Sequence, residues 1–267
     1  MLSQDYTNIE YIVMDANSTD NTVKILEDYG ERITWKSEKD NGQADAVNKG
    51  VNLARGEIIG WLNSDDVYVE GTIKKVSTFF LTHPEIDVLY GNGYFINEHS
   101  NIIGCYPTKP FDSKMLAKTC FISQPTVFFR KSAFEKVGGL NTDLHLCMDY
   151  EFWIRLSFEV KFAHLNQFFA STRMYGDTKT LSRRSEVHRE VCDVLKKHYD
   201  YVPLHWLEAY VMYLYKDKLN PIKHLAILIK FILKYNPPYP KNIMNMSYEI
   251  VEFGYSKIKK YIFVKGD

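Results

Sequence analysis

The stretch Glu57-Ile58-Ile59-Gly60-Trp61-Leu62-Asn63-Ser64-Asp65-Asp66 decides the fold class, because in it an apolar run ends at two adjacent carboxylates. A short apolar run predicts a buried strand, and open α/β sheets place their ligand sites at the carboxyl ends of strands. Two acids at such an edge suit a hard divalent cation such as Mg²⁺, with substrate phosphates and water completing its coordination shell. The alternative is that Asp65 and Asp66 open a turn before the next helix, since Asp is a common turn residue.

The segments around this stretch alternate between strand and helix patterns. Strands are predicted at 9–14, 33–37 and 57–62, helices at 19–29, 43–54 and 71–83, and shorter strands at 88–90, 94–96 and 102–106. Strands that alternate with helices indicate a parallel sheet. The first part of the chain is therefore expected to be an α/β domain whose sheet has flanking helices.

Beyond residue 182 the sequence predicts helices alone. They are expected at 186–198, 206–215, 222–233 and 243–261, with Pro residues between them. We therefore expect a sheet-containing domain over 1–182 and a helical C-terminal extension over 183–267. No segment of the extension reaches the length of a membrane span.

The segment 224–234 of this extension is strongly apolar and carries lysines at one end. A Tyr- and Pro-rich segment follows it, and then the basic residues Lys257, Lys259 and Lys260. Two interpretations stay open. The segment packs onto the first domain or onto a partner subunit, as in a homo-oligomer, or it makes peripheral contact with a membrane.

The overall composition points away from nucleic acid. Lys and Arg together number 33 of the 267 residues, and so do Asp and Glu, so recognition has to come from local charge. The four cysteines have no paired zinc or redox spacing, which predicts reduced, mostly buried thiols. The first residues have neither the basic start nor the apolar core of a secretion signal, so we expect a cytoplasmic protein. Any peripheral contact with a membrane would then be with its inner face.

Three further clusters carry polar side chains at element ends. Asp15 ends the first predicted strand, at the edge where Asp65 and Asp66 are expected, and suits a carboxylate that accepts from a nucleotide base; a plain helix cap is the alternative. The segment 37–50 follows the second strand and opens a helix. In the third cluster, Asp149 and Glu151 begin an aromatic helix, where one acid can face a cleft and the other can interact with the helix dipole or an Arg one turn on.

These clusters, in this order, resemble the family 2 glycosyltransferases with the GT-A fold. The resemblance covers about residues 4–180, and six stretches carry it: IEYIVMDANSTDNT, SEKDNGQADAVNKG, GEIIGWLNSDD, SQPTVFFRKSAFEKVGGL, MDYEFWIRL and RMYGDTKT. It implies a GT-A-like nucleotide-binding sheet. It also implies transfer of a sugar from a nucleotide sugar to a glycan or lipid-linked acceptor in polysaccharide synthesis, and we expect the nucleotide to be UDP.

The resemblance also assigns residues to the donor site. Asn63-Ser64-Asp65 matches the D-x-D motif, which makes Asp65 the ligand of a divalent metal, Mg²⁺ or Mn²⁺. Asn63 would contact the ribose as a neutral group, and Asp66 would support the metal or add a ligand. Further residues of the nucleotide and phosphate site would be Asp15 at the base, Asp40, Gln43 and Asn48 along the pocket, and Arg173 and Lys179 in a closing loop. Tyr175 stands where some members have a metal-binding His, which puts a third protein ligand in doubt.

Asp149 matches the acid that serves as general base in a single inverting displacement. Met148 precedes it where many members have Glu, so Glu151 stays a minor alternative for the base. Family members normally begin with a strand and a helix before the segment that matches Gln4-Asp5-Tyr6. We therefore expect either a longer reading frame or a shortened form that binds nucleotide weakly unless another segment fills the gap. The competing hypothesis is a non-catalytic protein that binds a nucleotide sugar or a partner.

Overall fold

The computed structural model describes residues 1–176, 182–215, 220–238, 241–242, 244–246 and 249. The chain divides into two compact units, Met1–Thr178 and Lys179–Asp267. The boundary that the sequence predicts, between residues 182 and 183, lies beside residues 177–181, which fall outside the described part of the chain, and it stays a prediction.

The N-terminal part of the first unit forms a small parallel sheet. β1 (Ile12–Asp15) pairs in parallel with β2 (Thr34–Ser37), and this register places Asp15 opposite Ser37. α1 (Thr22–Asp28) connects the two strands, and α2 (Gln43–Leu53) follows β2. These four elements confirm the alternation that the hydrophobic pattern predicts.

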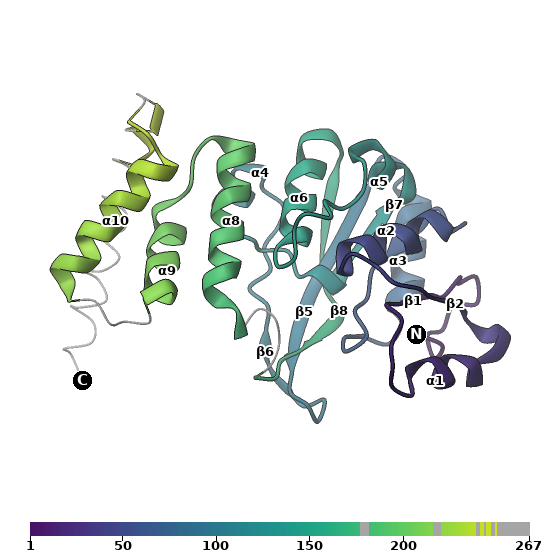
Figure 1. Cartoon of the computed structure of the whole chain (residues 1–267). Coiled ribbons are helices and arrows are strands. Elements are labelled where there is room, and N and C mark those ends of the chain that lie inside the picture. The colour runs from purple at the N-terminus through teal and green to yellow at the C-terminus, as the bar shows by residue number, and fades with distance from the viewer. Residues whose placement is uncertain (177–181, 216–219, 239–240, 243, 247–248, 250–267) are drawn as a thin grey trace, which may run out of the picture. The chain divides into compact units, whose positions relative to one another are not determined.

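The main sheet of the first unit has six strands and a mixed direction. Its strand order is β3-β7-β5-β8-β4, and β6 pairs with β5 beside this path. The strands are β3 (Ile58–Gly60), β4 (Val67–Tyr68), β5 (Val88–Ile96), β6 (Ile102–Cys105), β7 (Val127–Arg130) and β8 (Phe162–Arg173). β5 and β8 pair in parallel along most of their lengths, as Figure 1 shows, and the other pairs are antiparallel.

The prediction that the first three strands form one parallel sheet was wrong. β3 pairs with β7 in an antiparallel direction and lies in a different sheet from β1 and β2. Among the residues that the structure describes, no strand bridges β1 and β3, so the two hydrogen-bond ladders stay separate. The two predicted strands at 88–90 and 94–96 are parts of one strand, β5.

Helices cover both faces of the main sheet. The neighbours Phe128 and Phe129 on β7 point to opposite faces, because side chains alternate along a strand. Phe128 joins a buried cluster with Val76 and Phe80 of α3 (Thr72–Thr82), and Phe129 packs against Phe152 of α6 (Met148–Glu159). Two short helices, α4 (Ser113–Leu116) and α5 (Lys131–Val137), complete this unit. The sheet is thus sandwiched between α3 on one face and α5 and α6 on the other.

Gly60 is the last residue of β3, and the sheet leaves no room there for a side chain. A Cβ at this position would lie 2.7 Å from a ring carbon of Phe128 and 2.7 Å from the hydroxyl of Tyr68. Such distances are far below van der Waals contact, so a larger residue would push β3 away from its neighbours. The glycine lets the end of β3 lie close to the side chains of Phe128 and Tyr68 before the chain reaches the carboxylates.

The second unit is helical in its described residues. α8 (Arg184–Tyr199), α9 (Leu204–Tyr215) and α10 (Pro221–Tyr235) confirm three of the predicted helices, and the fourth, at 243–261, lies mostly outside the described residues. Two of the four cysteines, Cys147 and Cys192, are buried, whereas Cys120 is half-buried and Cys105 is exposed. The prediction of mostly buried thiols is therefore correct for only part of them. Across the described part of the chain, the helices are too short or too polar to cross a membrane.

Candidate nucleotide-sugar site

The two adjacent carboxylates lie where β3 leaves the main sheet. Asp65 and Asp66 follow β3 and lead directly into β4, whose two residues pair with Ser171 and Ala170 of β8. The carboxylate loop, residues 61–66, is therefore held by strands at both ends. This loop confirms the predicted position of the acids after a strand.

Asn63 is the hydrogen-bonding centre of the carboxylate loop. Its Oδ1 accepts from Gln43 Nε2 at 2.7 Å and from Trp61 Nε1 at 3.1 Å. Its Nδ2 donates to Asp66 Oδ2 at 3.1 Å and to Gln124 Oε1 at 3.0 Å. The amide of Asn63 thus joins the start of α2, the carboxylate pair and the segment before β7. The structure brings Gln43 and Asn63 together, as expected for residues of one cleft.

Asp66 is a buried carboxylate beside a second acid. Its Oδ1 accepts from the backbone N–H of Arg173 at 3.0 Å, in addition to the contact with Asn63. Burial raises the pKa of Asp66 to about 6, and the charge of Asp65 adds to the increase, although the hydrogen bond from Arg173 opposes it. An ionised Asp66 is therefore costly unless a cation lies nearby. The oxygen donors and their excess negative charge fit a hard divalent cation at this loop.

Asp65 is half-buried and contacts Tyr175, which stands where some family members have a histidine. The hydroxyl of Tyr175 donates to Asp65 Oδ2 at 3.1 Å. Among the described residues, no three His, Cys, Asp or Glu side chains gather closely enough to enclose a metal ion. A cation at Asp65 would therefore take most of its ligands from substrate and water, which is usual for Mg²⁺.

The guanidinium of Arg173 donates to protein oxygens through all three nitrogens. Nε donates to the backbone oxygen of Asp65 at 3.0 Å, and Nη1 donates to the backbone oxygen of Asn97 at 2.8 Å. Nη1 and Nη2 also donate to the hydroxyl of Ser100, at 3.1 and 3.2 Å. Arg173 therefore connects the carboxylate loop to the turn between β5 and β6. The sequence assigned it to substrate phosphates, whereas the structure shows it in contact with the chain itself. Lys179, the other predicted phosphate contact, lies outside the described residues.

Asp15 lies at the end of β1 and accepts hydrogen bonds from two serines. Ser37 Oγ donates to Oδ2 at 2.5 Å, and Ser18 donates through its N–H to Oδ2 at 3.0 Å and through its hydroxyl to Oδ1 at 2.5 Å. Burial alone would raise the pKa of Asp15, but these hydrogen bonds outweigh burial and lower it. At the start of the helix that follows, α1, the side chain of Asp20 accepts from the N–H of Thr22 at 2.9 Å. Asp15 is thus an ionised acceptor at neutral pH and does not cap this helix.

The other two residues predicted for the nucleotide pocket lie just before α2 and within it. Asp40 accepts from the N–H of Gly42 at 2.9 Å in the turn that precedes the helix. Asn48 lies one turn further along α2 than Gln43 and clasps the backbone of Leu140, donating to its carbonyl at 2.9 Å and accepting from its N–H at 2.8 Å. The side chain of Asn48 is therefore engaged in the fold. It ties α2 to the segment that leads into α6.

Asp149 and Glu151 lie in the first turn of α6 and have different surroundings. Glu151 is buried and accepts from Nε and Nη2 of Arg155, both at 2.8 Å, while Arg155 also donates to the carbonyls of Val137 and Gly139. This confirms that one acid pairs with the Arg one turn on. Asp149 is half-buried. Burial of the Cys120 thiol raises its pKa to about 12, and the nearby charge of Asp149 adds to this increase.

Further partners of the carboxylate loop are not marked by any pattern in the sequence. Gln124 accepts from Asn63 and donates through Nε2 to the backbone oxygen of Trp61 at 2.6 Å. Gln124 lies in one of the six stretches that carry the resemblance, but no local pattern marks its role. Its partner is 61 residues away, and only the antiparallel pairing of β3 with β7 brings the two side by side.

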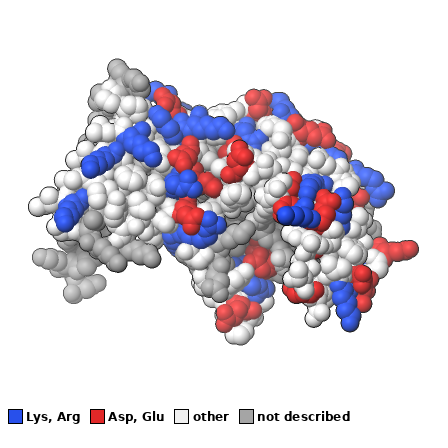
Figure 2. Space-filling view, in the orientation of Figure 1, with Lys and Arg blue, Asp and Glu red and all other residues white. Residues whose placement is uncertain are grey.

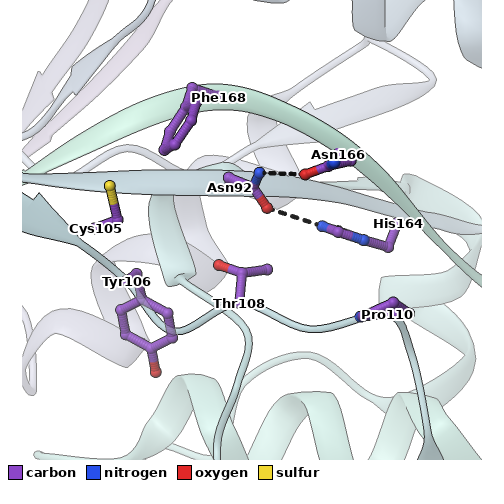
Figure 3. A pocket seen from close by; sticks show the side chains of 8 residues that line it. All are labelled: Asn92, Cys105, Tyr106, Thr108, Pro110, His164, Asn166 and Phe168. Atoms are coloured by element: carbon purple, nitrogen blue, oxygen red, sulfur yellow. Dashed lines mark hydrogen bonds between the residues drawn. The ribbon is translucent and has the colours of Figure 1, made fainter.

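A pocket of about 360 Å³ opens over β5 and β8 (Figure 3). Its lining residues are Asn92, Cys105, Tyr106, Thr108, Pro110, His164, Asn166 and Phe168. Asn92 hydrogen-bonds to a ring nitrogen of His164 at 3.0 Å and donates to Asn166 at 2.9 Å. Burial lowers the pKa of His164, which favours the neutral imidazole. The lining thus combines neutral hydrogen-bonding groups with aromatic rings, a chemistry that suits hydroxyl groups and not phosphates.

The family model for glycosyl transferase family 2 matches residues 1–138, slightly more than half of the chain. The chain belongs to glycosyl transferase family 2. Among curated proteins, a glycosyltransferase of Methanocaldococcus jannaschii is 29% identical over 180 residues, which are 64% of this chain and 62% of that protein. The chondroitin synthase of Escherichia coli is 27% identical over 215 residues, 76% of this chain and 31% of the synthase. The chain of this family 2 protein therefore spans less than two thirds of the length of either relative.

Solved structures show that the family 2 chain has the GT-A fold. S. aureus TarS 1-349, crystallised with UDP-GlcNAc, superposes with a TM-score of 0.61 at 16% identity and covers 91% of this chain and 76% of its own. The mannosyltransferase PcManGT of Pyrobaculum calidifontis, in complex with GDP-Man and Mn²⁺, has a TM-score of 0.54 at 15% identity, covering 92% of this chain and 78% of its own. These likenesses confirm the fold expected from the six sequence stretches.

Proposed function

We propose that this family 2 chain is an inverting, metal-dependent glycosyltransferase that moves a sugar from a nucleotide sugar to a glycan or lipid-linked acceptor in polysaccharide synthesis. One observation carries the proposal: the half-buried Asp65 stands beside the buried Asp66, which Asn63 and Arg173 hold in place at the edge of the sheet. Two adjacent carboxylates fit the divalent cation that would accompany a nucleoside diphosphate. When bound there, the cation would neutralise charge on the departing diphosphate.

The donor is proposed to lie across the two sheets of the first unit. Asp15 would accept from an N–H of the base, because its carboxylate is ionised and can only accept hydrogen bonds. Uracil is the expected base, and the UDP-GlcNAc complex of TarS supports it, whereas the GDP-Man complex of PcManGT makes guanine the comparison to test. Asp40, Gln43, Asn48 and Asn63 would line the pocket, Asn63 and Gln43 through the network they share.

Asp149 is proposed as the general base. It would take the proton of the acceptor hydroxyl while the acceptor oxygen forms a bond to the anomeric carbon and the bond from that carbon to the diphosphate oxygen breaks, which inverts the configuration. It lies in the first turn of α6, where the helix dipole attracts a negatively charged side chain. Glu151 is the weaker choice for this role, because both of its oxygens accept from Arg155. The neutral pocket over β5 and β8 supports a carbohydrate acceptor.

Turnover of a labelled donor tests the proposal. The folded chain is incubated with Mn²⁺ and labelled UDP- or GDP-sugars, and sugar transfer or hydrolysis is compared with that of Asp149→Asn and Asp65→Ala. We expect turnover with a UDP-sugar and loss of about 10²–10⁴-fold in Asp149→Asn. A correctly folded parent chain that neither turns over nor binds any donor would overturn the proposal.

A non-catalytic protein that binds a nucleotide sugar is the second candidate. The separation of β1 and β2 from the main sheet favours it, because the proposed base contact, Asp15, and the carboxylate loop lie on different sheets. Calorimetric titration with UDP distinguishes the two functions. Donor binding that depends on Asp65, without turnover by the parent chain, would support this second candidate over the enzyme.

A further inference from the structure

The helix α10 has one face packed into the second unit. Phe231 contacts the ring of Tyr210 on α9 edge-on, with centroids 5.0 Å apart, and the buried Tyr235 donates through its hydroxyl to Asp193 of α8 at 2.8 Å. These contacts fix the rotation of the helix about its own axis. They determine which side chains point away from the other helices.

The opposite face of α10 is apolar and exposed. Ile222, Leu225, Ile229 and Leu233 have exposed fractions of 81, 58, 47 and 56%. Their spacing of three, four and four residues places them in one stripe along the helix. Apolar side chains normally occupy the buried stripe of a surface helix, so α10 is apolar on two sides. We call these four residues the outer stripe.

A row of lysines runs beside the outer stripe. Lys223, Lys230 and Lys234 each follow a stripe residue by one position, which places them about 100° further round the helix. The sequence from residue 220 to 238 contains no Asp or Glu. Figure 2 shows the α10 end of the surface as uncharged atoms beside blue side chains. This face is therefore both apolar and purely basic.

We propose that the outer stripe of α10 lies in the interface of an anionic lipid bilayer, with the lysines at the headgroups. Buried apolar area and attraction to anionic lipids are the two sources of affinity for such helices, and α10 supplies both. A second copy of the chain fits this face poorly, because two copies would bring lysine rows together with no acid from either α10 to pair with them. Binding of α10 to a bilayer would be independent of the proposed glycosyl transfer.

Vesicle sedimentation with the full chain tests the inference. The probes are vesicles of phosphatidylcholine alone and vesicles in which phosphatidylglycerol replaces part of it, at low salt. We expect at least about tenfold tighter binding to the anionic vesicles, weakening as salt increases. Equal binding to both kinds of vesicle, or binding to neither, would overturn the proposal.

Two variants and a matched control assign the binding to α10. Leu225→Glu with Ile229→Glu places charges in the outer stripe, and Lys223→Gln, Lys230→Gln and Lys234→Gln together remove the lysine row. Both should lose at least about tenfold in affinity for anionic vesicles while keeping the melting temperature of the parent, because the substituted side chains are exposed. Leu81→Glu, at an 80% exposed leucine of α3, should bind as the parent does. An equal loss in Leu81→Glu, or a dimer in sedimentation velocity that Leu225→Glu dissociates, would contradict the bilayer as the partner.

Discussion

The guanidinium Nε of Arg173 donates to the backbone oxygen of Asp65 at 3.0 Å, across 108 residues of sequence. The backbone N–H of the same arginine donates to the neighbouring Asp66. One residue of β8 therefore holds both acids of the carboxylate loop, while its Nη atoms bind the turn between β5 and β6. Arg173 is a positioning residue in this structure, and the first prediction follows from it.

Replacing Arg173 by alanine should destabilise the protein and weaken metal binding together. The change leaves part-buried carbonyls of the carboxylate loop and of the turn without these donors, which should lower the free energy of unfolding by about 1–3 kcal/mol. Urea unfolding measures the loss, and titration of Mn²⁺ in the presence of UDP measures the metal affinity. Arg55→Ala is the control, because Arg55 forms an exposed ion pair with Glu10 and should change stability by no more than about 1 kcal/mol. Unchanged metal affinity in a folded Arg173→Ala variant would contradict the positioning role.

Asp66 should make the metal-free protein less stable as pH rises. Its pKa in the folded protein, about 6, lies above the ordinary value of 3.8, so between those two values the folded state binds more protons than the unfolded state. Stability therefore decreases as pH increases through this window, and the loss is complete above about pH 6. We expect the contribution to be about 1–3 kcal/mol.

The comparison of parent and Asp66→Asn isolates this effect. Urea unfolding in the presence of a chelator, at intervals from pH 4 to pH 7.5, gives the difference in unfolding free energy between the two proteins. As pH increases through the window, the parent should lose stability relative to Asp66→Asn, and the difference should be constant at higher pH. A difference that is the same at every pH would show that Asp66 does not titrate in this range.

The two acids of α6 should respond differently to substitution. Glu151→Ala leaves Arg155 partly buried without its carboxylate, which should cost about 3–5 kcal/mol of stability. Asp149→Asn should keep the free energy of unfolding within about 1 kcal/mol of the parent and lose turnover. Thermal unfolding and donor turnover are measured on both variants. If Glu151→Ala is stable but inactive while Asp149→Asn stays active, the general base would be Glu151 and not Asp149.

Tyr175→His should strengthen metal binding. The tyrosine hydroxyl contacts the carboxylate of Asp65, so an imidazole introduced there stands next to the proposed metal ligand. Because imidazole nitrogen is a common metal ligand, we expect the dissociation constant of Mn²⁺ to decrease by about tenfold. Calorimetry in the presence of UDP measures it. Tyr175→Phe removes the hydroxyl without adding a ligand and should not tighten binding; equal tightening in both variants would mean that loss of the hydroxyl alone is responsible.

Local features of this protein follow from the sequence by itself. The strand before Asp65, the helix that begins at Gln43 and the pairing of Glu151 with Arg155 one turn on could all be predicted, because each depends on residues within a few positions of one another. The family resemblance and the GT-A fold also followed from short stretches in order. Even the apolar and basic character of α10 is visible in its residue spacing.

Tertiary structure alone decided how these parts meet. The antiparallel pairing of β3 with β7 brings Gln124 to Asn63, and the pairing of β4 with β8 brings Arg173 to the carboxylate loop. The assignment of Arg173 to phosphates missed this, because a side chain that binds substrate and one that binds a distant carbonyl have the same local sequence. Hydrogen bonds between residues 60 to 110 positions apart depend on strand order and register, which local propensity does not encode. The acids could thus be found from the sequence, whereas the network that holds them required the folded sheet.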